Sequence, residues 1–277
     1  IATLGPATDD DSVIEKLIQA GINLVRINFS HGKLSDHQNR VNAVRKYATA
    51  LGLQIGILAD LQGPKIRIAQ FENGRVTLDP GAEFVLDASL QATAGTPGTV
   101  GLDYKELSKD VGPGDILLLD DGRIELAVDR IDGLQIFCTV KNGGELSNNK
   151  GINRKGGGLS AGALTDKDRE DLKAAAAMQV DYLAISFVRS ASDIKEARGL
   201  LKEVNSTAGI IAKIERADAV EAIDDIIRES DGVMIARGDL GVEIGDAEVP
   251  AIQKRIIERA RALDKPVITA TQRMESM

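Results

Sequence analysis

The chain of 277 residues is long enough for one large α/β domain or two ordinary domains. Its 42 acidic and 34 basic residues give a net charge of -8, which disfavours a nucleic-acid or anionic-membrane partner. There is no apolar run near the roughly 20 residues that cross a bilayer, and we expect no leader before Ile1. The single Cys138 rules out an internal disulfide and fits a reducing compartment. We therefore expect a cytoplasmic protein with no membrane partner.

Strand-like apolar runs recur along the chain, and most of them are separated by amphipathic helical stretches. The runs lie at residues 1–5, 23–29, 55–61, 182–188, 209–215, 232–237 and 266–271. A hydroxyl residue followed three positions later by a hydrogen-bond acceptor predicts helix starts at Thr8, Ser35, Thr165 and Ser190. This alternation predicts parallel β/α units.

One interval, residues 63–160, lacks the helical period. Short β-like runs alternate there with Gly, Pro and Asp turns, at residues 75–78, 84–87, 116–119, 124–128 and 135–140. We predict an α/β fold: an incomplete (β/α)8 TIM-type barrel with about seven strands, and an all-β domain inserted after the third strand. The barrel would comprise residues 1–62 and 161–277, and residues 63–160 would form a β-barrel lid.

Charged residues interrupt the ends of two apolar strands. Lys213 and Glu215 are two positions apart, as are Arg237 and Asp239, so each pair shares one face of its strand. A structural ion pair at a barrel rim would also explain this pattern. Polar residues follow the other strands too, at Asn28, Ser30, Asp60, Ser186 and Thr271. Active sites of (β/α) barrels lie at these strand ends, which favours a site there.

The residue types suggest the chemistry of such a site. Glu215 and Asp239 end adjacent predicted strands, and two carboxylates with open positions suit Mg²⁺ or Mn²⁺. The absence of a Cys and His cluster disfavours zinc. Lys213 could neutralise a phosphoryl group or an enolate, and amides at the start of a helix after Arg237 could bind a carboxylate or phosphate. Together they predict a site for a small polyanion.

The motifs TLGPAT, RINFSHG, DLQGPKIR, DDG, KGIN, AISFV, AKIE, MIARGDLGVEI and PVITATQRMESM follow one another in this order. Together they resemble the pyruvate kinase family over the whole chain. The resemblance implies transfer of a phosphoryl group from phosphoenolpyruvate to ADP, giving pyruvate and ATP in glycolysis, with Mg²⁺ or Mn²⁺ as cofactor.

The resemblance also implies roles for single residues. Lys213 would stabilise charge on the phosphoryl group and enolate, Arg26 would contact the transferring phosphate, and Thr271 would lie near the carbon that is protonated. Gly238 and Asp239 would hold the substrate carboxylate, with Lys213 and Thr271 also contacting the substrate.

The metal and nucleotide positions follow in the same way. Glu215 and Asp239 would bind Mg²⁺, and Asp121 would lie on the lid above the metal and nucleotide. The implied nucleotide-binding residues are Arg67, Lys150, Asn28 and His31. From the residues alone, we interpret His31 as an incidental surface imidazole.

One position departs from many members of the family. They have glutamate where this chain has Lys65, and they need K⁺. The resemblance places the monovalent cation site at Asn28, Ser30, Asp60 and the Leu61 carbonyl. An ammonium group beside Asp60 would do the electrostatic work of K⁺, so we expect an enzyme that does not require it.

Family members continue beyond the last residues of this chain and are usually homotetramers. A barrel that lacks its last strand has two open edges, so we expect these residues alone to be unstable or inactive. Two other functions fit part of the pattern. A Mg²⁺-dependent barrel aldolase would also place Glu and Asp at successive strand ends, but it would not need Lys213 or the β insertion. A non-catalytic regulator is disfavoured because Lys213, Glu215 and Asp239 are all present.

Overall fold

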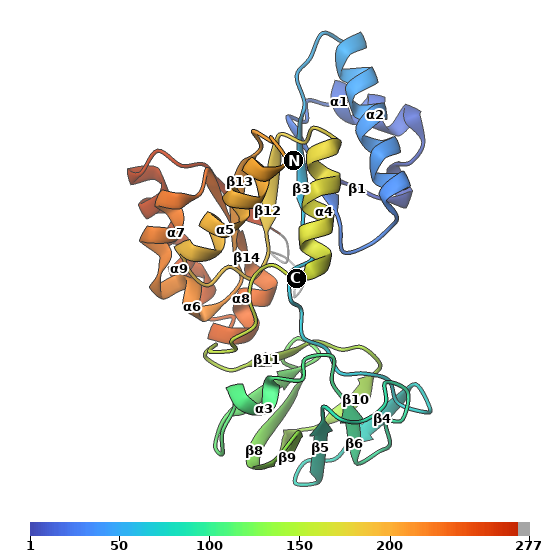
Figure 1. The fold of residues 1–277 in the computed structure, drawn as a ribbon, viewed down its shortest axis with the longest axis vertical. Coiled ribbons are helices and arrows are strands. Elements are labelled where there is room, and N and C mark those ends of the chain that lie inside the picture. Colours follow the sequence, from blue (N-terminus) through green and yellow to red (C-terminus); the bar gives the residue numbers. More distant parts are fainter. Residues whose placement is uncertain (271–277) are drawn as a thin grey trace.

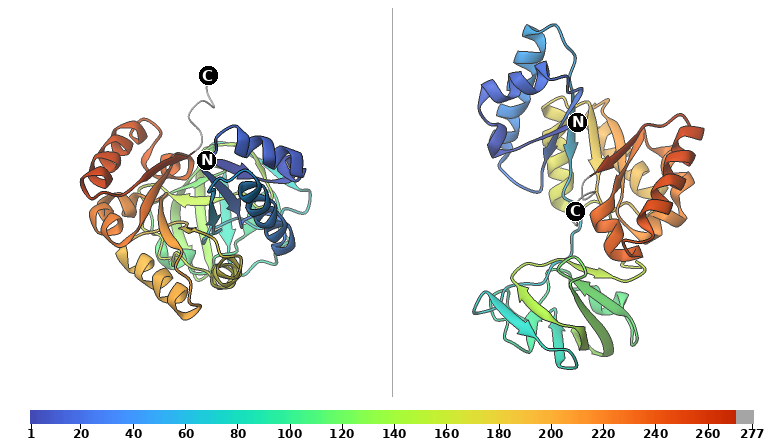
Figure 2. Two further views of the ribbon diagram at one scale, coloured as in Figure 1. Left: turned by 90° about the horizontal axis from the view of Figure 1, so that it is seen from above. Right: turned by 180° about the vertical axis from the view of Figure 1, so that it is seen from behind.

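The computed structural model describes residues 1–270, in which a curled parallel sheet surrounded by helices stands above a separate β region (Figures 1 and 2). Seven strands pair in this part of the chain, in the order β1-β2-β3-β12-β13-β14-β15. They are β1 (Ala2–Leu4), β2 (Leu24–Asn28), β3 (Gly56–Asp60), β12 (Tyr182–Ile185), β13 (Gly209–Ile214), β14 (Gly232–Ala236) and β15 (Val267–Ala270). The predicted incomplete barrel is confirmed, with β1 and β15 as its edges.

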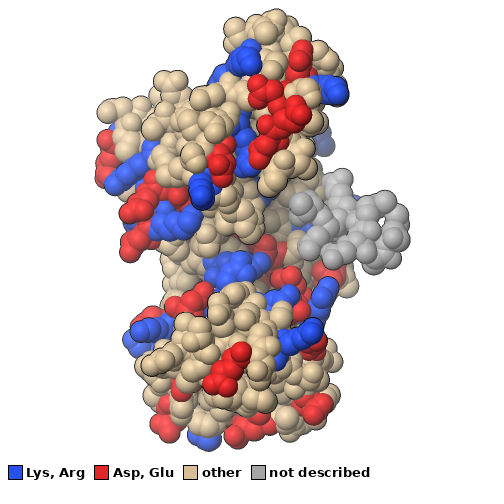
Figure 3. All heavy atoms as spheres, turned by 90° about the vertical axis from the view of Figure 1, so that its right-hand side faces the viewer, with Lys and Arg blue, Asp and Glu red and all other residues tan. Residues whose placement is uncertain are grey.

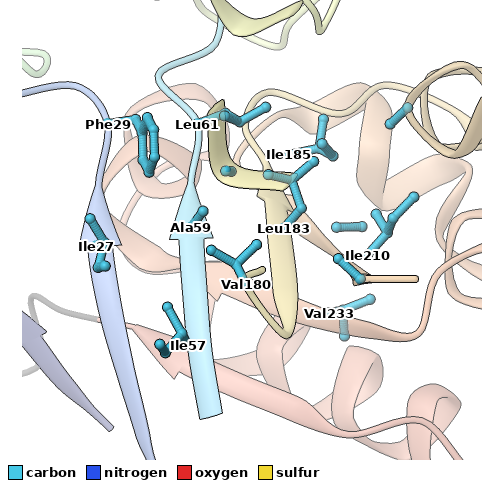
Figure 4. Packing of buried hydrophobic residues seen from close by; sticks show 14 of the residues in the cluster. Ile27, Phe29, Ile57, Ala59, Leu61, Val180, Leu183, Ile185, Ile210 and Val233 are labelled. Atoms are coloured by element: carbon cyan, nitrogen blue, oxygen red, sulfur yellow. The ribbon is translucent and has the colours of Figure 1, made fainter. Parts of the chain in front are cut away.

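Helices cover the outer face of this sheet because each strand sends alternate apolar side chains toward them. Figure 4 shows Ile27, Ile57, Leu183, Ile210 and Val233 among the side chains of this shared core. The helices are α1 (Asp11–Gln19), α2 (Leu34–Ala50), α4 (Asp166–Ala177), α5 (Ala191–Glu203), α6 (Ala217–Glu221), α7 (Ile223–Glu229), α8 (Arg237–Ile244) and α9 (Val249–Ala262), with a 3₁₀ turn η1 (Pro6–Thr8) before α1.

Two of the four predicted helix starts are confirmed, since Thr165 and Ser190 are N-caps. The other two are wrong. Helix α1 begins after Asp10, two residues later than predicted, because the Thr8 hydroxyl bonds to the Gly5 carbonyl in the preceding 3₁₀ turn. Helix α2 begins after Lys33, two residues earlier than predicted. A hydroxyl with the right spacing is therefore not sufficient when another local partner competes for it.

The interval after β3 forms two further sheets with a core of their own. A six-stranded sheet has the order β11-β7-β8-β9-β5-β6, and β10 pairs with β4 in a separate antiparallel two-stranded sheet. The strands are β4 (Arg75–Leu78), β5 (Glu83–Asp87), β6 (Thr99–Gly101), β7 (Ile116–Leu119), β8 (Ile124–Asp132), β9 (Gln135–Asn142), β10 (Gly144–Ser147) and β11 (Ile152–Arg154). The predicted all-β insertion is confirmed, although it also contains the short helix α3 (Leu107–Asp110). The domain boundaries at residues 62/63 and 160/161 remain predictions.

Cys138 lies inside this second core, on β9, and is fully buried between Phe84 of β5 and Val128 of β8. Burial raises the pKa of its thiol to about 12, and the Asp129 carboxylate adds to the increase. Because of this raised pKa, the Cys138 thiol stays protonated in the folded protein at a pH where the same thiol ionises in the unfolded chain. The free energy of unfolding is therefore unaffected by this thiol below its ordinary pKa of about 8.5, and it falls as the pH rises from there toward 12.

We expect the native protein at pH 8 to react with iodoacetamide far more slowly than it does in denaturant, because only a thiolate reachable from solvent is alkylated. Mass spectrometry of the alkylated peptide measures both rates. Equal rates in native buffer and in denaturant would contradict the burial of this thiol.

No helix among residues 1–270 is both long enough and apolar enough to span a membrane.

Candidate active site

The inner face of the curled sheet changes from apolar to charged along the strands. Leu58, Ala184, Ile211 and Met234, from four neighbouring strands, form a small apolar cluster of their own. Two residues beyond Ile211 on β13 is Lys213, which faces the same side. The apolar cluster therefore forms the floor of a polar site at the carboxyl ends of the strands, where (β/α) barrels place their active sites.

Lys213 is at the centre of this site and is buried. Its Nζ lies 2.9 Å from Glu215 Oε1 and 3.2 Å from Asp60 Oδ1, and it donates a hydrogen bond of 2.7 Å to the Ser186 hydroxyl. The Ser186 hydroxyl donates in turn to the Leu61 carbonyl at 2.7 Å. Burial alone would lower the pKa of Lys213, but the two carboxylates outweigh burial and raise it, so the ammonium stays charged.

Asp60 joins Lys213 to a second cation. Its Oδ2 accepts a hydrogen bond of 2.6 Å from Arg26 Nε, and its side chain is almost fully buried. The parallel register explains the meeting, because Asp60 on β3 is opposite Asn28 of β2 and Ala184 of β12. Arg26, Asp60, Lys213 and Glu215 thus form one continuous network of alternating charge.

Glu215 is held from both sides. Its Oε2 accepts a hydrogen bond of 2.7 Å from the Phe187 amide, and its Oε1 faces Lys213. Burial raises the pKa of Glu215, Lys213 opposes this increase, and the Asp239 carboxylate adds to it.

Lys65 differs from the prediction. Its Nζ pairs with Asp239 Oδ1 at 3.0 Å, and it does not contact Asp60. The expected position beside Asp60 is therefore wrong. The physical reason is that Arg26 and Lys213 already neutralise the Asp60 carboxylate, whereas Lys65 is the cation paired with Asp239 among the described residues.

The basic residues predicted for the nucleotide gather on the inserted region. Arg67 and Lys150 are close together, because Arg67 bridges Gly151 and donates from Nη1 to the Asn149 carbonyl at 3.0 Å. Lys150 Nζ also pairs with Asp120 at 2.6 Å. Figure 3 shows Lys and Arg side chains collected at the hollowed waist between the barrel and the inserted region.

The remaining predicted residues take less central positions. Asn28 accepts a hydrogen bond from the Ser30 amide at 3.0 Å, which forms a turn at the end of β2. His31 and Asp121 are exposed, and Asp121 has a positive φ of 55°. Gly238 is in the first turn of α8, which begins at Arg237 and so earlier than the helix expected to follow Arg237-Gly238-Asp239. Thr271 lies outside the described residues.

A divalent cation fits the donor set of Glu215 and Asp239. Each carboxylate already holds an ammonium group, at 2.9 Å for Lys213 and 3.0 Å for Lys65, so the pair attracts positive charge. Among residues 1–270 there is no group of three or more His, Cys, Asp and Glu side chains arranged to hold a metal. A metal here would keep open positions for water or substrate oxygens, as Mg²⁺ does.

Sequence reasoning missed the buried glutamate Glu243 near the site. Glu243 follows Asp239 by one helical turn on α8 and is 4% exposed. Burial raises the pKa of its carboxyl, while hydrogen bonding from the Ala217 amide lowers it. A glutamate between Val242 and Ile244 was a visible hint, since a charge inside an apolar stretch requires a partner.

The fold and the site define a (β/α)-barrel protein with an inserted β domain and a charged site at the strand ends suited to a small polyanion and a divalent cation. The family model "Pyruvate kinase, barrel domain" matches residues 1–277, and the chain belongs to the pyruvate kinase family.

Proteins of known name agree with this assignment. The chain is 55% identical to a pyruvate kinase of Haemophilus influenzae and 56% identical to pyruvate kinase II of Salmonella typhimurium, each over 280 aligned residues. It is 42% identical to a pyruvate kinase of Staphylococcus aureus. All of this chain is covered in each comparison, but only 59%, 58% and 47% of those relatives. The chain thus spans less than two thirds of their length.

Proposed function

We propose that this chain carries the catalytic barrel of a pyruvate kinase, which transfers the phosphoryl group of phosphoenolpyruvate to ADP and yields pyruvate and ATP. The observation that carries the proposal is the buried Lys213 beside Glu215, Asp60 and Ser186, in a chain that belongs to this family. Phosphoryl transfer depends on positioning and charge neutralisation more than on covalent help from the protein.

The proposed reaction needs positive charge at two places. The bond between phosphorus and the enol oxygen breaks while a bond forms from phosphorus to a terminal phosphate oxygen of ADP. Lys213, kept protonated by its carboxylate neighbours, would neutralise the charge that develops on the enol oxygen and the moving phosphoryl group. Arg26, fixed by Asp60, would bind the phosphate from the other side. A proton then reaches the methylene carbon, for which we propose Thr271 as a neighbour.

The other roles are proposed from the same set of residues. Glu215 and Asp239 would bind Mg²⁺ or Mn²⁺, which supplies a Lewis acid for the phosphoryl oxygens. Gly238 and Asp239, at the amino end of α8, would orient the substrate carboxylate. The residues proposed for the nucleotide are Arg67, Lys150, Asn28 and His31.

We propose that K⁺ is not required, because Lys65 already places an ammonium group in the site, at Asp239. The measurement is pyruvate formation from phosphoenolpyruvate and ADP with Mg²⁺, in K⁺-free buffer and again after K⁺ is added. We expect rates within about twofold of each other, since a tethered cation supplies the same charge. A many-fold increase on adding K⁺ would discard this role for Lys65 and keep the kinase. No pyruvate under either condition, from a folded protein, would contradict the kinase itself.

We also propose that the 277 residues alone are inactive, because β1 and β15 are unpaired edges of the described sheet. The intact protein would be a cytoplasmic homotetramer. Sedimentation of the intact protein tests the tetramer. Turnover by the 277 residues at the rate of the intact protein would contradict the proposal that these residues alone are inactive.

A further inference from the structure

Glu243 connects three separate segments of the chain. Its Oε2 accepts a hydrogen bond of 2.9 Å from the Ala217 amide at the start of α6. Its Oε1 accepts one of 3.3 Å from Asn153 Nδ2 on β11, and its own carbonyl accepts one of 3.0 Å from the Gly156 amide. Helix α8, helix α6 and the segment by which the chain returns from the inserted region therefore meet at one buried carboxylate.

The return segment, residues 152–158, is pressed closely against this carboxylate. Gly157 has a φ of +80°, and a Cβ there would lie 3.3 Å from Glu243 Oε2 and 3.2 Å from the Ala217 Cβ. Gly156 and Gly158 on either side also have positive φ, at 83° and 89°. A side chain at Gly157 would thus be strained and crowded, which indicates a built contact rather than a free linker.

A second contact fixes the end of the return segment. Arg216, immediately before α6, is buried and donates from Nη2 to the Leu159 carbonyl at 2.5 Å and to Asp218 at 3.0 Å. A cavity of about 20 Å³ lies between these groups and is lined by Lys65, Asn153, Arg216 and Glu243, among others. Both crossings between the barrel and the inserted region therefore border the same small space.

We infer that Glu243 is a positioning residue that clamps the return segment of the inserted domain to α8, the helix whose first turn carries Asp239. The consequence rests on the proposed function. Residues of the inserted domain that bind the nucleotide, such as Arg67 and Lys150, are held at a fixed position relative to the metal ligand Asp239. Figure 1 shows β11 and α8 facing each other at this junction.

The Asn153–Glu243 pair allows a swap experiment in the intact protein. Asn153→Asp places a second carboxylate against Glu243, so the buried Glu243 Oε1 loses the hydrogen bond that Asn153 Nδ2 donates. We expect hydrogen exchange of the backbone amides of residues 152–158 to become about tenfold faster or more. In Asn153→Asp with Glu243→Gln, the new amide donates to the new carboxylate and still accepts from Ala217. Exchange should return to within about threefold of the unchanged protein.

Two further variants keep the test decisive. Asn153→Ala removes the hydrogen-bond donor without adding a charge, and it should give a smaller increase in the same exchange rate. This variant replaces Asn153→Asp in the test if Asn153→Asp does not fold. Glu248→Ala removes an exposed glutamate in the turn just beyond α8 and should leave exchange unchanged. Unaltered exchange in both Asn153 variants, or no recovery in the double variant, would overturn the inference.

Kinetics then separate positioning from mere stability. Asn153→Asp should raise KM for ADP by about fivefold or more while KM for phosphoenolpyruvate changes by less than about twofold, because only the inserted side of the site is loosened. Equal increases for both substrates would contradict the coupling. Absence of turnover in the unchanged protein would contradict the proposed function, and the exchange rates would still decide whether the clamp exists.

Discussion

Replacing Lys213 by methionine is expected to lower turnover strongly and to destabilise the fold. The substitution keeps an unbranched side chain one atom shorter but removes the cation between Glu215 and Asp60, at 2.9 and 3.2 Å. Breaking a buried ion pair by removing one partner costs about 3–5 kcal/mol of unfolding free energy. Loss of a group that stabilises transition-state charge lowers kcat by about a hundredfold to a thousandfold.

The matched control is Lys195→Met, which removes an exposed lysine that pairs with Glu229 at 3.5 Å. Such a surface pair contributes about 0–1 kcal/mol, so stability and turnover should hardly change. Urea unfolding followed by circular dichroism measures the first quantity, and pyruvate formation measures the second. If Lys213→Met unfolded at the same urea concentration as Lys195→Met, the buried ion pairs of Lys213 would not stabilise the fold.

Replacing Glu215 by glutamine is the second change expected to have a large effect. The amide keeps an oxygen for the Phe187 N–H, but its NH₂ group then faces Lys213 Nζ, so two donors meet. It also removes one of the two negative charges proposed to bind the divalent cation. We expect the affinity for Mn²⁺ to fall by about a hundredfold and turnover to fall with it.

Electron paramagnetic resonance of free Mn²⁺ during titration measures the affinity directly, whether or not the protein is active. Glu221→Gln, at an exposed position at the end of α6, is the matched control and should bind Mn²⁺ as the unchanged protein does. Unchanged Mn²⁺ affinity in Glu215→Gln would exclude Glu215 as a ligand and would require another place for the metal.

Much of the fold could be predicted because the apolar pattern determines which face of each strand is buried. The seven barrel strands and five strands of the insertion were found from this pattern alone. Strands β6, β10 and β11 were missed. Strands β6 and β11 have three residues, too few to show a period, and only one of the four residues of β10 is buried. Helix starts failed where a hydroxyl had another partner nearby, as Thr8 has in Gly5.

Some positions in the site could likewise be predicted from the sequence and others could not. Lys213 and Glu215 share a face by simple alternation along a strand, so their meeting followed from the sequence. The position of Lys65 could not be predicted in this way. Its long side chain can reach more than one carboxylate, and it pairs with Asp239 because Asp60 is already paired with Arg26 and Lys213. Glu243 was missed because its three partners come from segments that only the folded chain brings together.

The most direct test of the central claim follows the phosphoryl group itself. Phosphoenolpyruvate labelled with ³²P is incubated with the intact protein, ADP and Mg²⁺, and the products are separated by thin-layer chromatography. We predict that the label appears in the terminal phosphate of ATP, in an amount equal to the pyruvate formed, and that Lys213→Met lowers the rate of both by about a hundredfold or more. Label found only in inorganic phosphate, or unconverted phosphoenolpyruvate with a folded protein, would contradict phosphoryl transfer at this site.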